Sequence, residues 1–156
     1  MAKVRRGSRV TVDVTTEIDI DRPCEQVAAF ASDPDNAPRW YKNIDKAEWR
    51  TPPPLRVGSL IAFVARFLGR RLVYTYEVVE HRPGRRLAMR TAEGPFPMET
   101  TYEFEALGPN RTHMKLRNHG APTGFAKLVA PFVSLAMRSA NRADLRELKT
   151  LLERAG

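Results

Sequence analysis

The end of the chain constrains its fold most. From Gly124 to Arg154, apolar side chains recur at spacings of three and four, and basic or polar residues fill much of the rest. This period predicts one amphipathic helix, roughly 45 Å long at a rise of about 1.5 Å per residue. Pro131 lies inside this helix and predicts a kink or a second start there, because proline cannot donate to the carbonyl four residues back.

Most of the chain before this helix has the pattern of β-strands. Residues 10–20 alternate apolar and polar side chains, which predicts a strand with one face toward a core. Residues 21–41 predict two short helices. Further strands are expected at 46–51, 60–68, 72–80, 86–92, 98–106 and 112–118, most of them ended by glycine or proline. The chain therefore predicts an α+β fold, in which a curved, seven-stranded antiparallel sheet grips the long helix.

The length of 156 residues predicts a single domain over 9–156, preceded by a flexible basic arm at 1–8. No apolar run reaches the roughly 20 residues that a membrane span needs, so we expect no integral membrane association. No secretory signal is visible, and the single cysteine, Cys24, excludes a disulfide framework. These observations predict a cytoplasmic protein, as a monomer or homodimer.

The net charge of +8 comes from 26 Lys and Arg against 18 Asp and Glu. A basic chain can bind nucleic acid or anionic lipid. The cations are scattered, however, and no zinc-finger spacing, aromatic RNA-binding motif or basic zipper is present. We therefore expect no nucleic-acid partner.

Five stretches carry a resemblance that covers about Val10 to Glu153. The chain resembles the START/Bet v 1-like (SRPBCC) superfamily, in its bacterial polyketide cyclase/dehydrase and lipid-transport branch. The resemblance implies a cavity between sheet and helix that binds lipids, sterols, polyketides or hormones, with ring closure or dehydration in some members. The matching stretches are residues 18–27, 33–40, 57–59, 76–87 and 145–153, which include Asp33-Pro-Asp-Asn-Ala-Pro-Arg-Trp and Val57-Gly-Ser.

Strand alternation predicts which side chains would line such a cavity. Along residues 98–104 and 112–118, the alternate positions that begin with Met98 and Thr112 face inward. Residues 60–68 are apolar on both sides, so their orientation stays open. The predicted binding set is Trp40, Tyr74, Tyr76, Met89, Met98, Thr100, Tyr102, Phe104, Met114, Asn118, Phe125, Val129, Phe132 and Ala136, with Leu135 on the same expected helix face.

Two alternatives remain for this set. Its Met and aromatic side chains either fill a core or surround a ligand that satisfies the buried hydroxyl and amide groups. Trp40 and Tyr41, at the end of the second short helix, form either the mouth of a cavity or an apolar plug.

No well-defined catalytic motif is present in the sequence. His119, at the end of the last strand and near the expected cavity rim, is a candidate general base, and Tyr74, Tyr76 and Tyr102 are candidate acids or bases. No pair of histidines has metal-ligand spacing, and no phosphate or dinucleotide loop occurs, so we expect no metal and no cofactor.

Three functions follow as hypotheses. The first is binding of a small hydrophobic, partly oxygenated molecule, such as a lipid, polyketide or aromatic metabolite. The second is a polyketide aromatase/cyclase or dehydratase that uses the same cavity without metal or nucleotide cofactor. The third is a basic membrane-surface or interaction protein, suggested by the basic arm and the net charge of +8.

Overall fold

The structure is a computed structural model that describes residues 12–67, 69–94, 97–121 and 125–155. The predicted basic arm, 1–8, lies outside the described residues. The side chains of Phe67 and of residues 125–129 lie outside them as well, so two members of the predicted binding set, Phe125 and Val129, have no described side chain.

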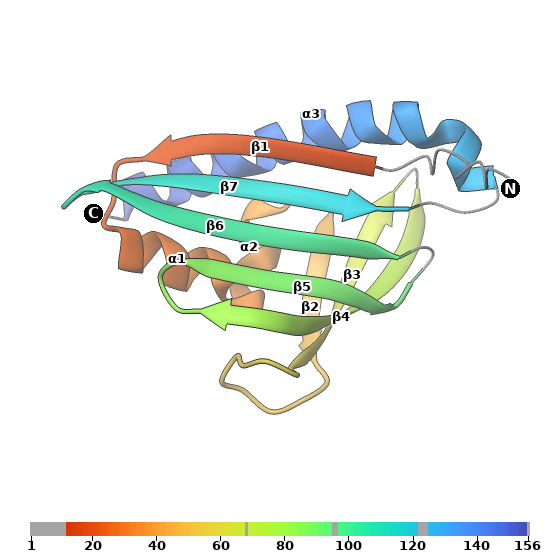
Figure 1. The fold of residues 1–156 in the computed structure, drawn as a ribbon, viewed down its shortest axis with the longest axis horizontal. Coiled ribbons are helices and arrows are strands. Elements are labelled where there is room, and N and C mark those ends of the chain that lie inside the picture. Colours follow the sequence, from red (N-terminus) through yellow and green to blue (C-terminus); the bar gives the residue numbers. More distant parts are fainter. Residues whose placement is uncertain (1–11, 68, 95–96, 122–124, 156) are drawn as a thin grey trace, which may run out of the picture.

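Seven antiparallel strands form one sheet, as predicted (Figure 1). Its spatial order is β1-β7-β6-β5-β4-β3-β2, so every strand after β2 pairs with the one that precedes it in the chain, and β1 pairs with β7. The strands are β1 (Val12–Ile20), β2 (Ile44–Trp49), β3 (Leu60–Phe67), β4 (Arg70–Arg82), β5 (Arg86–Glu93), β6 (Met98–Gly108) and β7 (Arg111–Gly120).

Two short α-helices follow β1, as predicted, with a short 3-10 helix between them. They are α1 (Cys24–Ser32), η1 (Pro34–Asn36) and α2 (Ala37–Trp40). The last element, α3 (Phe125–Arg154), is a single helix that runs through Pro131. Of the two expectations at Pro131, a kink or a second start, the second start is therefore excluded. A proline removes one hydrogen bond from a helix, and the rest of this long helix continues on both sides of it.

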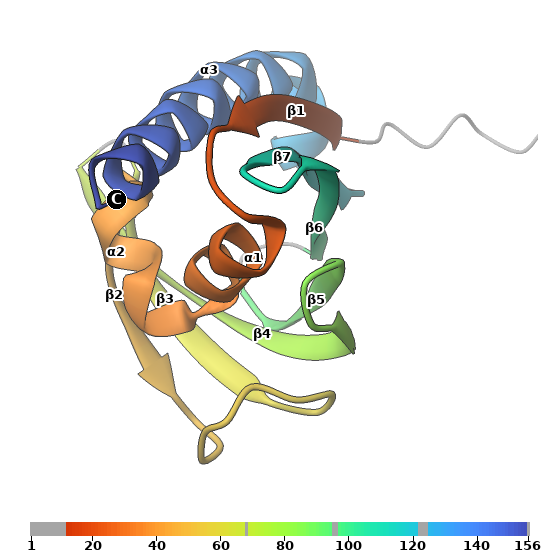
Figure 2. The ribbon, with the colours of Figure 1, turned by 90° about the vertical axis from the view of Figure 1, so that its left-hand side faces the viewer.

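The sheet curls strongly, and α3 lies along its first edge. Figure 2 shows the sheet curving from β1 around to β2, with α3 beside β1 and with α1 and α2 at one end of the curve. The second half of α3 enters the core, where Leu145, Leu148 and Leu152 are buried with Ile20 and Leu116. This arrangement leaves the concave side of β3–β7 to be filled by side chains or by a ligand.

The first half of α3 packs on the sheet through a different side from the one predicted. Ala130 and Met137 are the side chains that pack toward the sheet, against Val12, Val14 and Met98. Phe132 and Leu135 are 73% and 69% exposed, and Ala136 is exposed too. The expected inward orientation of these three is wrong, because apolar residues occur around the whole circumference of this stretch and their spacing does not single out one face.

The predicted strand alternation is confirmed for β6 and β7. Met98, Thr100, Tyr102 and Phe104 are buried, whereas Glu99 and Glu105 on the other side of β6 are exposed. In β7 the buried residues are Thr112, Met114, Leu116 and Gly120, all at even positions of the strand. In β3 both faces are largely buried, which explains why the sequence left its orientation open.

Candidate functional site

A small cavity lies on the concave side of the sheet. Its volume is about 130 Å³ and it opens to solvent. Two residues of its wall, Thr100 and Asn118, are paired near the end of β7, which is the end of the sheet at which α3 begins (Figure 1). Its lining residues come from β2–β7 and from the residue after α2: Tyr41, Ile44, Phe63, Ala65, Tyr74, Tyr76, Met89, Thr100, Tyr102 and Asn118.

Five of the ten residues in the wall are aromatic. Tyr74 and Tyr76 alternate along β4 and therefore point to the same side of the sheet, with ring centres 6.4 Å apart. Phe63, opposite Tyr74 in the register of β3 and β4, meets the Tyr76 ring edge-on at 5.8 Å. The resulting surface is apolar across the rings and polar at the hydroxyl tips.

Two side-chain hydrogen bonds fix the polar groups of the wall. The hydroxyl oxygens of Tyr41 and Tyr102 are 2.5 Å apart. Thr100 Oγ1 donates to Asn118 Oδ1 at 3.0 Å. Because the carbonyl oxygen of Asn118 accepts this bond, its amide nitrogen is left to donate to an oxygen atom of a ligand.

The tyrosines of the wall are neutral at physiological pH. Burial raises the pKa of Tyr76 to about 12, and it also raises the pKa of Tyr41, Tyr74 and Tyr102 above the ordinary value. Their hydroxyl groups therefore act as hydrogen-bond donors and acceptors toward a ligand rather than as phenolate bases.

A carboxylic acid lies close behind the Tyr41–Tyr102 pair. Asp144 of α3 is 5% exposed, and its Oδ1 accepts a hydrogen bond from the backbone nitrogen of Lys42 at 3.1 Å. Burial raises the pKa of Asp144 to about 6. Its negative charge also helps to raise the pKa of both Tyr41 and Tyr102, so the three groups form one electrostatic cluster.

Two further buried polar atoms belong to the same region of α2 and α3. Trp40 Nε1 and Asn141 Nδ2 have no hydrogen-bond partner among the described residues. Asn141 precedes Asp144 by one turn of the helix, and Trp40 stacks on Tyr41 with ring centres 3.9 Å apart. A buried donor without a hydrogen-bond partner lowers the stability of the folded state. These two atoms mark the polar end of an otherwise apolar core.

Six members of the predicted binding set come together in the cavity wall: Tyr74, Tyr76, Met89, Thr100, Tyr102 and Asn118. Four others, Trp40, Met98, Phe104 and Met114, are buried in the core but do not line the cavity. Phe132 and Ala136 point to solvent.

The alternatives for Trp40 and Tyr41 are resolved by their burial. Tyr41 lines the cavity, whereas Trp40 is 1% exposed and packs behind it. Of the two alternatives, mouth or apolar plug, Trp40 therefore takes the second, and this member of the predicted binding set does not line the cavity. Trp40 lies against the Tyr41 ring rather than in the cavity wall, because the two rings stack with their centres 3.9 Å apart.

His119 does not lie at the cavity rim. It pairs with Asp13 and Glu99 across the neighbouring strands and is exposed on the outer face. Since Asn118 points inward, strand alternation sends His119 outward, so the rim expectation is wrong. His113 is also on the outer face, as predicted, where the carboxylates of Asp19 and Glu17 raise its pKa.

Sequence reasoning missed Ile44, Phe63, Ala65 and the buried pair Asn141 and Asp144. A signal for the pair was present in the sequence. Both residues stand at helical spacing between Met137 and Leu148, on the stripe that the structure buries. A carboxylate at such a position indicates a buried acid rather than a solvated one.

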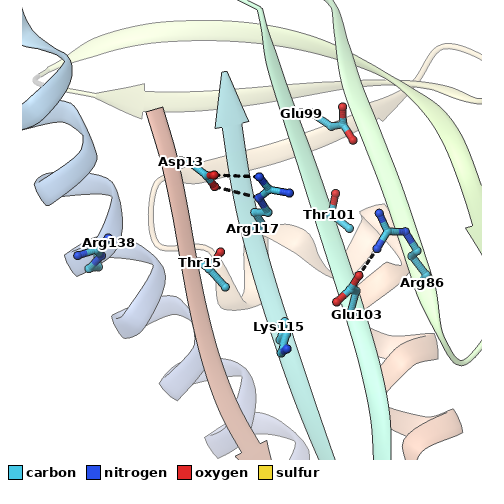
Figure 3. Close-up of a pocket in the computed structure, with 9 residues that line it drawn as sticks. All are labelled: Asp13, Thr15, Arg86, Glu99, Thr101, Glu103, Lys115, Arg117 and Arg138. Atoms are coloured by element: carbon cyan, nitrogen blue, oxygen red, sulfur yellow. Dashed lines mark hydrogen bonds and ion pairs between the residues drawn. The ribbon is translucent and has the colours of Figure 1, made fainter. Parts of the chain in front are cut away.

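A larger cavity, of about 580 Å³, lies on the outer face of the sheet (Figure 3). Charged side chains of both signs line it. Arg117 donates two hydrogen bonds to Asp13, at 2.9 and 2.8 Å, and Arg86 forms an ion pair with Glu103. Since four of its seven charged side chains pair with one another and the cavity opens to water, we assign it to the solvated surface and not to a ligand site.

Cys24 and the remaining acidic residues do not suggest other chemistry. Burial raises the pKa of the Cys24 thiol, whose Sγ donates to the carbonyl of Gly84 at 3.4 Å. Within the described ranges, no cluster of three or more His, Cys, Asp or Glu is placed to hold a metal ion. No helix in the described part of the chain is long and apolar enough to cross a membrane.

A curled antiparallel sheet that holds a long C-terminal helix, with a cavity on its concave side, defines the helix-grip class of START/Bet v 1-like proteins. Residues 11–153 match the model of the family described as "Polyketide cyclase / dehydrase and lipid transport". The chain belongs to this family, which supports hydrophobic-ligand binding or polyketide cyclase activity in general terms. No curated protein matches the chain significantly.

Solved structures share the fold at low sequence identity. A Thermus thermophilus protein is 22% identical, with a TM-score of 0.78 over 92% of this chain and 99% of that one. A START superfamily protein from Mycobacterium smegmatis is 15% identical, with a TM-score of 0.77 over 92% and 99%. The Zhui aromatase/cyclase from a Streptomyces strain is 18% identical, with a TM-score of 0.76 over 92% and 94%. At these identities the similarity establishes the fold alone.

Proposed function

We propose that the protein binds a small, mostly apolar and partly oxygenated molecule in the concave cavity. The observation that carries this proposal is the composition of the wall, in which aromatic and aliphatic surface surrounds a few fixed polar groups. Such a combination is typical of small-molecule sites, where apolar contact gives affinity and a few polar atoms give orientation.

The size of the cavity limits what it holds. A volume of about 130 Å³ is slightly less than the roughly 150 Å³ that binds one benzene ring in an engineered apolar cavity. The enclosed part of the ligand is therefore one ring or a short stretch of chain. Longer lipids or polyketides would extend out of the cavity toward solvent.

Native mass spectrometry tests whether the protein carries such a molecule. Protein from a host related to the source would show excess mass that leaves on denaturation. Purified protein should also bind p-xylene, a probe of one ring, in a titration followed by NMR. Ala65→Trp fills the cavity from β3 and should abolish this signal, whereas Val73→Trp, at an exposed position of β4, should leave it unchanged. Equal signals from the two variants would place the probe elsewhere and contradict the proposal.

The second candidate function is a polyketide aromatase/cyclase. The observation that favours it is the acid behind the tyrosine pair. Asp144 has a pKa of about 6, and its charge helps to raise the pKa of Tyr41 and Tyr102. An aldol ring closure needs one proton removed from carbon and one delivered to a carbonyl oxygen. Asp144 does not line the cavity, so it would exchange these protons with the substrate through the hydrogen-bonded Tyr41–Tyr102 pair.

The cyclase candidate is tested with a linear polyketide thioester mimic. Tyr102→Phe and Asp144→Asn should lower kcat by roughly a hundredfold, as loss of acid–base groups does, while binding of the mimic persists. The pH profile of kcat should also lose its inflection near 6 in Asp144→Asn. Unchanged turnover in both variants would eliminate this candidate and leave the binding function in place.

A further inference from the structure

The first half of α3 carries an exposed apolar patch. Phe132 and Leu135 are 73% and 69% exposed, which makes them the two most exposed large apolar side chains among the described residues. Ala136 beside them is also exposed. These residues are three and four positions apart, so they lie on one side of the helix. The opposite side of the same stretch already packs on β1 through Ala130 and Met137.

Basic residues lie next to this patch, and no acidic residue on the same stretch of the helix offsets their charge. Between positions 125 and 143 the sequence contains no Asp or Glu, but it contains Lys127, Arg138 and Arg142. Arg138 and Arg142 are exposed and follow Leu135 by three and seven residues, along the same side of the helix. Among the described residues, the ion pair within α3 is Lys149–Glu153, near its far end.

We infer that this face of α3, formed by Phe132, Leu135, Ala136, Arg138 and Arg142, docks onto an anionic lipid bilayer. A helix that lies on a membrane buries its apolar side chains at the level of the headgroups, and its basic side chains attract anionic lipids. The net charge of +8 adds a long-range attraction toward such a surface. The helix would lie along the bilayer without crossing it.

A second copy of the chain fits this face less well. A symmetric dimer would place the same patch of both copies together, which brings Arg138 and Arg142 of one copy close to those of the other. Like charges across an interface disfavour association. The patch also has two large apolar side chains, which is little for a stable protein interface.

The position of this face of α3 means that membrane docking would also concern the cavity. Thr100 and Asn118 of the cavity wall are paired near the end of β7, and α3 begins at that end of the sheet (Figure 1). A bilayer under the first half of α3 would therefore stand on the side of the molecule from which these two residues contribute to the wall. The docking itself does not depend on any ligand.

Co-sedimentation of the full chain with vesicles tests the inference. The wild type should bind vesicles of phosphatidylcholine and phosphatidylglycerol, bind pure phosphatidylcholine weakly, and lose affinity as salt rises. Phe132→Glu with Leu135→Glu should weaken binding by roughly tenfold or more, since charged groups replace the inserted ones. The matched control is Val73→Glu with Leu107→Glu, which adds the same charge at positions 45% and 49% exposed on other elements.

Three results would overturn the inference. The first is that the wild type does not bind the anionic vesicles. This includes the case in which the wild type forms a dimer that the Phe132→Glu, Leu135→Glu substitutions dissociate, since the face would then bind a second copy of the chain. The second is equal loss in the matched control. The third is binding that survives the α3 substitutions but disappears when residues 1–8 are removed. Probe binding in the cavity should persist in the α3 variant, so failure of docking is distinguishable from failure of the proposed ligand-binding function.

Discussion

The hydroxyl oxygens of Tyr41 and Tyr102 lie 2.5 Å apart and join the end of α2 to the middle of β6. Tyr102 is 5% exposed, so water does not readily replace a lost partner there. The pair thus holds the cavity wall to the cap formed by the short helices.

Tyr102→Phe should therefore destabilise the protein by about 1–3 kcal/mol, because it leaves the Tyr41 hydroxyl without its partner. Tyr41→Phe should cost a similar amount, and the double variant less than the sum of the two. Urea denaturation of the four proteins measures the coupling between the two residues. Strictly additive losses would mean that the hydrogen bond contributes nothing to stability.

The buried acid predicts a specific pH dependence of stability. The pKa of Asp144 is raised by burial from 3.8 to about 6, so the folded state holds this proton more tightly than the unfolded state. The free energy of unfolding should then fall as pH rises from about 4 to about 6, by up to about 3 kcal/mol from this group. Asp144→Asn should remove that fall and be the more stable protein at pH 7.

Denaturation of wild type and Asp144→Asn across this pH range checks the sign. Glu153→Gln is a useful control on the same helix, because Lys149 lowers the pKa of Glu153 and gives the opposite dependence. If wild type and Asp144→Asn keep a constant difference between pH 4 and 7, Asp144 is not a buried acid with a raised pKa.

The strands were predictable because their pattern is local. Alternation along residues 98–104 identifies Thr100 and Tyr102 as inward-facing with no knowledge of their neighbours, and both line the cavity. The same alternation, applied one residue further along β7, would have placed His119 outside. The family motifs supplied the remaining information, that sheet and helix belong to one helix-grip domain.

The buried side of α3 was harder to predict, because it depends on which other elements contact the helix. Around Phe132, apolar residues occur on every side, and only the contact of Ala130 and Met137 with β1 decides which side is inside. Cavity residues such as Ile44 and Ala65 depend on the pairing of β2 with β3, which no local pattern reveals. Asp144 was visible in principle, as a charge on the stripe that contains Leu148.

The orientation of α3 predicts a large contrast between two substitutions of similar size. Leu148 is fully buried, so Leu148→Ala should destabilise the protein by about 2–5 kcal/mol. Phe132→Ala removes a larger side chain, yet it should change the free energy of unfolding by about 0.5 kcal/mol or less, because Phe132 is 73% exposed. Thermal or urea denaturation of both variants measures the contrast, and a loss above about 2 kcal/mol for Phe132→Ala would show that the first half of α3 packs inward after all.

The Thr100–Asn118 pair predicts how the cavity discriminates between ligands. Two probes of one ring test this, p-cresol with a hydroxyl group and p-xylene with a methyl group in its place. The wild type should favour p-cresol, because the amide of Asn118 donates to its oxygen. Thr100→Val with Asn118→Leu replaces both polar groups together, so no buried donor is left without a partner. This double variant should bind p-cresol about fivefold more weakly, which corresponds to one net hydrogen bond, and bind p-xylene at least as well as the wild type.

Titrations followed by NMR give both dissociation constants, with Asn110→Leu in the turn between β6 and β7 as the control. Asn110 is exposed and remote from the cavity wall, so this variant should keep the wild-type preference. A parallel loss of both probes in the double variant would indicate a collapsed cavity rather than a lost hydrogen bond. An unchanged preference for p-cresol would instead move the polar contact to the hydroxyl groups of Tyr41, Tyr74, Tyr76 or Tyr102, which are the other polar groups of the wall.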